Sequence, residues 1–130
     1  LIPSLTALEN VAMPLMFKGV GKQEREARAL EMLRLVGLEN RKNHRPFEMS
    51  GGQQQRVGIA RAFVSNPRVI FADEPTGNLD SETTKNVMQL VCGLVHENNS
   101  TMILVTHDNG VAEFADKIIT IIDGKISNEN

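Results

Sequence analysis

Two adjacent carboxylates, Asp73 and Glu74, close the short apolar run 69–72. A run of this length between turn residues is typical of a buried parallel strand. In open α/β sheets, ligands lie at the carboxyl ends of the strands. Side chains alternate along a strand, so one carboxylate could hold a hydrated Mg²⁺ ion while the other orients a water molecule. A solvated strand end would explain the same pair, and the pair alone leaves both interpretations open.

A second candidate segment consists of Ser50, Gly51, Gly52 and Gln53. Ser50 and Gln53 have the spacing of a capping box, which predicts that a helix begins here. The N–H groups at a helix N-terminus favour an anion, phosphate above all. Each glycine costs the helix about 1 kcal/mol relative to alanine, so the pair suggests that something requires the bare backbone. A capped helix with no ligand is the alternative.

Two further residues follow predicted strands or loops. His107 comes directly after the apolar run 101–106 and could reach a phosphate at the same sheet edge, although an ordinary loop histidine is the simpler interpretation. Asp80 ends the loop 77–80, where it could cap the next helix, contact a partner, or do both. No cysteine and histidine spacing resembles a zinc site, and Cys92 is expected to pack within a helix.

Helices are expected in the first half of the chain. Thr6 and Glu9 predict a capping box, and Pro14 should kink or end the helix that it starts. The range 22–36 is amphipathic, and Gly37 suits the position after its end. The range 39–48 is expected to be a loop, followed by a helix from Ser50 to about residue 65.

Strands and helices alternate in the second half, which predicts an α/β fold. Buried parallel strands are expected at 68–72 and 101–106, with a helix at 81–98 between them. A short helix or turn is expected at 109–115. Residues 118–127 predict a hairpin around the turn Asp123-Gly124.

Composition limits the classes of function. The chain has 130 residues and a net charge of −2, which is a poor fit to a nucleic-acid-binding protein. Hydrophobic residues make up 41% and charged residues 23%, as in ordinary globular domains. The apolar run 11–17 is far shorter than the roughly 20 residues of a membrane span, so no direct membrane insertion is expected. The single cysteine excludes an internal disulfide.

In this order, the motifs resemble those of the nucleotide-binding subunit of ATP-binding cassette (ABC) transporters. Residues 50–53 resemble the family signature, with Met49 where leucine is usual. Residues 69–74 resemble the Walker B strand, 77–80 the D-loop, and His107 the switch histidine. The amino-acid sequences of residues 72–80 and 1–14 most resemble those of the lipoprotein-release and macrolide-export branch. The resemblance implies a partial P-loop NTPase core with parallel strands in 67–130 and an α-helical subdomain in 1–66.

The resemblance also implies roles for individual residues. Two ATPase subunits would sandwich two ATP molecules head to tail, and Ser50, Gly51, Gly52 and Gln53 would contact the γ-phosphate of ATP bound by the partner subunit. Asp73 would hold Mg²⁺ through water, and Glu74 would act as general base on the attacking water. His107 would contact the γ-phosphate, and Asp80 would lie at the dimer interface. Residues 1–18 would meet a transmembrane permease, which would hold the subunit at the cytoplasmic face of the membrane.

No G-x-x-x-x-G-K-[ST] segment is present to cradle the β- and γ-phosphates. We therefore expect a C-terminal part of such a subunit, inactive by itself. The resemblance places the P-loop strand between 102–105 and 118–122, so its absence should leave a gap in the sheet. The chain alone is then expected to be marginally stable, rearranged or self-associated. A non-transport ABC-type ATPase and a non-catalytic interaction domain are the alternatives.

Overall fold

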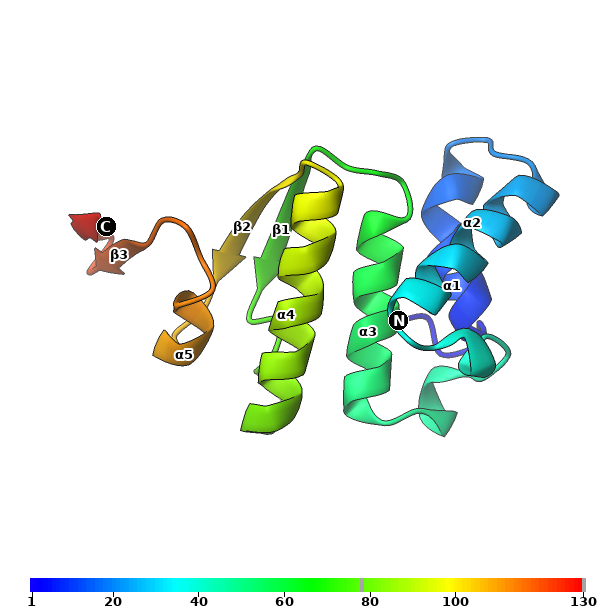
Figure 1. Cartoon of the computed structure of the whole chain (residues 1–130), viewed down its shortest axis with the longest axis horizontal. Helices are drawn as coiled ribbons and strands as arrows, with labels where there is room; N and C mark the ends of the chain where they lie inside the picture. Colours follow the sequence, from blue (N-terminus) through cyan, green and yellow to red (C-terminus); the bar gives the residue numbers. More distant parts are fainter. Residues whose placement is uncertain (78, 130) are drawn as a thin grey trace.

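The computed structural model describes residues 1–77 and 79–129 (Figure 1). Asn78, which belongs to the predicted loop 77–80, and Asn130 lie outside the described residues. The elements in chain order are α1 (Ala7–Phe17), α2 (Lys22–Leu35), the 3₁₀ turns η1 (Glu39–Arg41) and η2 (Pro46–Glu48), α3 (Gly51–Phe63), β1 (Val69–Asp73), α4 (Ser81–Glu97), β2 (Thr101–Val105), α5 (Asn109–Ala112), β3 (Ile119–Ile122) and β4 (Lys125–Glu129).

The capping box predicted for α1 is present. The Glu9 amide donates to Thr6 Oγ1 at 3.2 Å, and the Thr6 amide donates to Glu9 Oε2 at 2.8 Å. The hydrogen bonds from the Thr6 backbone and side chain hold the pKa of the Glu9 carboxyl below its usual value. Of the two effects expected of Pro14, a kink or the end of the helix, the second does not occur, because α1 continues to Phe17. An interior proline removes one N–H from the helix ladder and crowds the carbonyl four residues earlier. The helix continues nevertheless, and Leu15 in its last turn is 1% exposed in the core.

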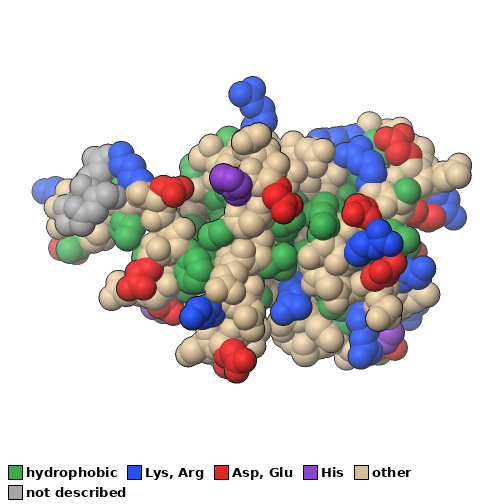
Figure 2. Space-filling view, viewed as in Figure 1, with side chains coloured by type: hydrophobic (Ala, Val, Ile, Leu, Met, Phe, Trp, Pro, Cys, Tyr) green, Lys and Arg blue, Asp and Glu red, His purple; other side chains and the backbone are tan. Residues whose placement is uncertain are grey.

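One buried cluster joins the four longer helices and β1. Its largest fully buried side chains include Phe63 of α3, Leu15 of α1, Leu33 of α2 and Val87 of α4. Burying a side chain of this kind contributes about 1.5–3 kcal/mol. In Figure 1, α4 and α3 lie next to each other, with α1 and α2 beyond α3. Figure 2 shows acidic and basic side chains interspersed over the same side of the molecule.

The parallel pair β1–β2 runs in register from Val69 opposite Thr101 to Asp73 opposite Val105. The helix α4 connects the two strands and lies over one face of the pair (Figure 1). The expectation that both strands are buried is wrong for the opposite face, where Phe71 is 77% exposed and Val105 57% exposed. Continuous apolar strands suit a sheet covered on both faces, and in the part of the chain that the structure describes helices cover only one.

The hairpin β3–β4 forms as predicted. Asp123 and Gly124 have φ values of 50° and 73°, which a two-residue hairpin turn of type I′ requires. Among the strands that the structure describes, this hairpin forms a sheet of its own and does not pair with β2. Among the described residues, no helix is long and apolar enough to cross a membrane.

Candidate functional site

In Figure 1 the strands β1 and β2 run downward, so their carboxyl ends point towards the lower side of the molecule, where α3 and α4 begin. Parallel pairing brings the ends of the two strands together, because Asp73 is opposite Val105. The strand β1 begins and ends one residue later than expected. Asp73 is therefore its last residue, and Glu74 lies just beyond it. The tertiary structure therefore gathers the sequence-predicted site residues at one edge.

Glu74 and His107 are in direct contact. His107 Nδ1 lies 2.6 Å from Glu74 Oε1, and the backbone N–H of His107 donates to the same oxygen at 3.2 Å. The side chains are partly open to solvent, with 38% of Glu74 and 86% of His107 exposed. The hydrogen bond to the Glu74 carboxylate and its negative charge raise the pKa of His107 above the ordinary value. A carboxylate paired with a proton-carrying imidazole is suited to orient a water molecule and take up its proton.

The backbone of Glu74 is strained. Its φ of 45° lies in the left-handed region, which costs a residue with a Cβ about 1–2 kcal/mol. The Glu74 amide donates to the Val105 carbonyl at 2.9 Å, and the Gly77 amide donates to the Glu74 carbonyl at 3.2 Å. These bonds make the chain turn sharply as soon as the strand ends. Strain of this kind is concentrated at functional sites, where the surrounding structure holds it in place.

The side chain of Asp73 lies on a different side of the strand end from that of Glu74. It shares the alternation of Val69 and Phe71, so it lies on the exposed face of the sheet, whereas the turn carries Glu74 to His107. A cleft of about 500 Å³ contains Glu74 and His107, and its described lining does not include Asp73. The two carboxylates therefore face different surroundings, and the cause is the turn at Glu74, which lies outside the strand to which the expected alternation applies.

The start of α3 is capped as predicted. The Gln53 amide donates to Ser50 Oγ at 3.2 Å, and the Ser50 amide donates to Gln53 Oε1 at 3.0 Å. Gly52 also has a packing role that the sequence did not reveal: a Cβ added there would lie 3.0 Å from the Thr83 methyl carbon. The bare backbone is needed where α3 meets α4, in addition to anything it does for a ligand.

Asp80 caps α4, which was one of its two expected roles. Its Oδ1 accepts from the Thr83 amide at 2.9 Å, and its Oδ2 accepts from the Thr83 hydroxyl at 2.6 Å. These hydrogen bonds, the one from the hydroxyl first, lower the pKa of the Asp80 carboxyl. Because the side chain is exposed, capping leaves room for a contact with a partner.

Several residues at this end were missed by sequence reasoning. Gln55 Nε2 donates to the Pro75 carbonyl, 20 residues away, and no local pattern signals such a contact. Lys85 lines the cleft with Glu74. Asp108 accepts from the Gly110 amide at 2.8 Å and so caps α5. The order Asp-Asn-Gly could have indicated this cap.

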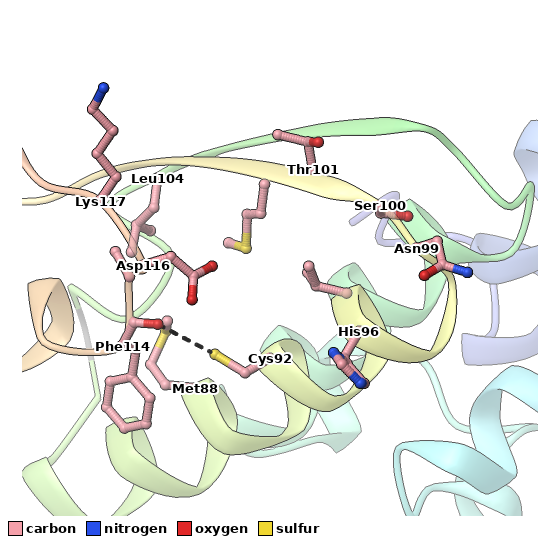
Figure 3. Close-up of a pocket in the computed structure, with 13 residues that line it drawn as sticks. Met88, Cys92, His96, Asn99, Ser100, Thr101, Leu104, Phe114, Asp116 and Lys117 are labelled. Atoms are coloured by element: carbon pink, nitrogen blue, oxygen red, sulfur yellow. Dashed lines mark hydrogen bonds between the residues drawn. The ribbon is translucent and has the colours of Figure 1, made fainter.

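A second cleft, of about 670 Å³, opens between α4, β2 and the segment 114–117 (Figure 3). Cys92 and His96 line it, and the Cys92 thiol lies 4.0 Å from the Phe114 carbonyl oxygen. Burial raises the pKa of this thiol, so it is a poor nucleophile. Within residues 1–77 and 79–129, no group of three or more His, Cys, Asp or Glu side chains could hold a metal ion. This cleft contains none of the predicted site residues.

Comparison with known proteins shows which class of protein the chain resembles. The chain is 53% identical to the ABC transporter ATP-binding protein MJ0796 of Methanocaldococcus jannaschii, over 99% of the chain and 57% of that protein. It is 51% identical to the macrolide export ATP-binding/permease protein MacB of Neisseria gonorrhoeae, over 97% of the chain and 19% of MacB. It is 46% identical to the lipoprotein-releasing system ATP-binding protein LolD of Chromohalobacter salexigens, over 99% of the chain and 54% of LolD.

A solved dimeric structure of MJ0796 in a post-hydrolysis state, bound to ADP and Pi, superimposes with a TM-score of 0.85. It is 50% identical in sequence, and the match covers 100% of this chain and 58% of that one. The fold is therefore the α/β fold of an ABC ATPase. The family model described as ABC transporter matches residues 1–77.

The chain belongs to the ABC transporter family, as an ATP-binding member of the branch that contains LolD and MacB. It spans a little more than half the length of the relatives MJ0796 and LolD.

Proposed function

We propose that the chain is part of an ATP-binding subunit that hydrolyses ATP to power export or lipoprotein release. The contact between Glu74 and His107 at the ends of two parallel strands carries the proposal, because it supplies a carboxylate and an imidazole to one reacting centre. The names of MacB and LolD support a transport role over a non-transport ATPase. An acidic strand end, a strained turn and a paired histidine are hard to explain in a non-catalytic interaction domain.

Glu74 is proposed as the general base. Its carboxylate is partly exposed in the cleft, within reach of a water molecule, and would accept the proton of that water as it attacks the γ-phosphate. His107 would hold the carboxylate in place through Nδ1 and contact the γ-phosphate. The backbone strain at Glu74 is consistent with a geometry that is fixed before the substrate arrives.

Asp73 is proposed as the Mg²⁺ residue. Magnesium keeps several of its waters and is bound through one or two carboxylates together with substrate phosphates. The exposed carboxylate of Asp73 at the end of β1 suits this mode, because it leaves space for a hydrated ion. When bound, the ion neutralises charge on the phosphates.

The start of α3 is proposed to serve a second subunit. Ser50, Gly51, Gly52 and Gln53 form a capped helix start, and the first N–H groups of a helix have no acceptor within the helix. They would bind the γ-phosphate of ATP held by a partner subunit in a head-to-tail dimer. The dimeric assembly of MJ0796 with ADP and Pi supports this arrangement. The exposed Asp80 would lie at the interface of that dimer.

The remaining partner is proposed to be a transmembrane permease. Residues 1–18 would contact it and hold the subunit at the cytoplasmic face of the membrane. The relative MacB is named as an ATP-binding/permease protein, which supports such a partner. The division into a helical subdomain, 1–66, and part of the ATPase core, 67–130, belongs to the same proposal.

The decisive experiment is ATP hydrolysis by the full-length protein with Mg²⁺. Glu74→Gln keeps the size of the side chain but removes the base, and we expect kcat to fall by about 10²–10⁴-fold. Glu113→Gln, which changes another carboxylate lining the same cleft, is the control and should retain activity. Comparable kcat values for the two variants would reject the proposal. The chain 1–130 by itself is expected to show no turnover, and hydrolysis by it that Glu74→Gln abolishes would overturn that expectation.

A further inference from the structure

The start of α3 is joined to the turn after β1 through Gln55. Its Nε2 donates to the carbonyl of Pro75, the residue that follows Glu74. The bond is partly buried and spans 20 residues of sequence. It connects two parts of the candidate site that have different proposed roles: the capped start of α3 and the acidic end of β1.

The neighbouring glutamines do something different. Gln53 belongs to the capping box with Ser50. Gln54 Nε2 donates at 3.2 Å to the carbonyl of Met49, the residue just before the N-cap of α3. The side-chain bonds of Gln53 and Gln54 therefore stay within the two residues that precede α3, whereas that of Gln55 reaches the turn after β1. The sequence therefore provides a residue of the same type, one position away, as a matched control.

The turn after β1 needs such support. Glu74 has a left-handed backbone, and a residue before proline is already restricted by contact with the proline ring. The turn is held internally by the Gly77 amide on the Glu74 carbonyl, and the Leu79 amide donates to the Thr76 carbonyl at 3.0 Å. These bonds hold the internal conformation of the turn. The bond from Gln55 fixes it relative to α3.

We propose that Gln55 is a positioning residue that sets the turn 74–77 against α3 and thereby aims the Glu74 carboxylate. Its catalytic meaning rests on the proposed function, since Glu74 is the proposed base. The start of α3 also lies close to the segment after the turn: a Cβ added at Gly51 would contact the Leu79 side chain at 4.0 Å, and one added at Gly52 would crowd Thr83 of α4 at 3.0 Å. A movement of the α3 start would be transmitted to the turn through Gln55.

Hydrogen–deuterium exchange on the full-length protein tests the connection without ATP. Gln55→Met removes the donor but keeps the length, and exchange at the Glu74, Gly77 and Leu79 amides should accelerate about 2- to 13-fold. Amides in the middle of β2 and α4 should be unchanged. Gln54→Met should leave all of these amides as in the wild type. Unchanged exchange at the turn, or equal acceleration throughout the molecule, would overturn the proposal.

A second variant covers the case in which Gln55→Met does not fold. Gln55→Lys keeps an N–H donor that can reach the Pro75 carbonyl, so it should protect the turn amides as the wild type does. If the turn amides alone lose protection in Gln55→Lys, the hydrogen bond to the Pro75 carbonyl is not what protects the turn.

ATP hydrolysis separates positioning from simple stabilisation. Gln55→Met should lower kcat with little change in KM, whereas Gln54→Met should change neither. If the turn amides respond but kcat does not, Gln55 has no positioning role. If the wild-type protein hydrolyses no ATP, the proposed function fails, and the exchange experiment still decides whether Gln55 holds the turn.

Discussion

Glu74 combines three local properties: a left-handed backbone, a partner histidine and a position directly after a strand. The left-handed turn diverts its carboxylate to His107, 33 residues further along the chain, while Asp73 stays on the exposed face of the sheet. Adjacent acidic residues therefore face different surroundings. The difference arises from a single backbone turn and needs no buried charge.

At the residue scale, we predict that His107 titrates above the ordinary histidine value of about 6.5 and that Glu74→Gln removes the shift. Because the pKa is raised in the folded state, the pair stabilises the fold fully below the ordinary value. This contribution is lost as the pH rises through the raised value. An NMR titration of the His107 ring measures it, with Glu113→Gln as control. The same pKa in the wild type and in Glu74→Gln would contradict the contact.

At the element scale, α3 and α4 begin side by side, and each start is capped by a side chain of its own, Ser50 or Asp80. Gly52 lets the two helix starts approach, and Thr83 is held in the facing turn by both of its bonds to Asp80. The contact between the starts of α3 and α4 therefore leaves little space for a larger side chain at position 52.

We predict opposite effects for two glycines of α3. A Cβ at Gly58 would meet nothing within 4 Å, so Gly58→Ala should raise the free energy of unfolding by about 0.5–1 kcal/mol. Gly52→Ala should lower it by about 1–3 kcal/mol, because the new methyl group meets a Thr83 side chain that is tied down. Denaturant unfolding measures both values.

The cause of the Gly52→Ala effect can be checked by adding Thr83→Ser. This change removes the opposing methyl group but keeps the hydroxyl that binds Asp80, so it should restore part of the lost stability. If Gly52→Ala were as stabilising as Gly58→Ala, the close approach of the helices would be refuted.

At the scale of the whole molecule, the apolar surface is unevenly covered. Helices cover one face of β1–β2 in part, while Val69, Phe71, Ile103 and Val105 are exposed on the other, and the strand β3 is exposed throughout. Contiguous apolar patches of this kind favour association, and an open strand edge favours pairing with another chain.

We therefore predict that the chain 1–130 by itself self-associates as its concentration rises. Phe71→Thr should shift the equilibrium towards the monomer, because it removes the most exposed large side chain of the open sheet face. Phe47→Thr is the control, since Phe47 is 74% exposed but lies outside the sheet. Analytical ultracentrifugation distinguishes the outcomes, and a monomer at every concentration would contradict the prediction.

The sequence by itself determined the features whose bonds close within a few residues. The capping boxes at Thr6 and Ser50, the cap at Asp80 and the hairpin turn at Asp123 could all be predicted. Such bonds depend on side-chain type and spacing along one element, which the chain states directly. The strand–helix–strand order likewise indicated that the acidic pair and His107 would share an edge.

Only the tertiary structure decided which distant groups meet and what is covered. The Glu74–His107 distance, the bond from Gln55 to Pro75 and the close approach of Gly52 to Thr83 join different elements. Apolar strands indicate burial on both faces, yet burial depends on what packs against them, and here one face is open. Packing is a property of the folded surfaces together, so local sequence patterns cannot specify it.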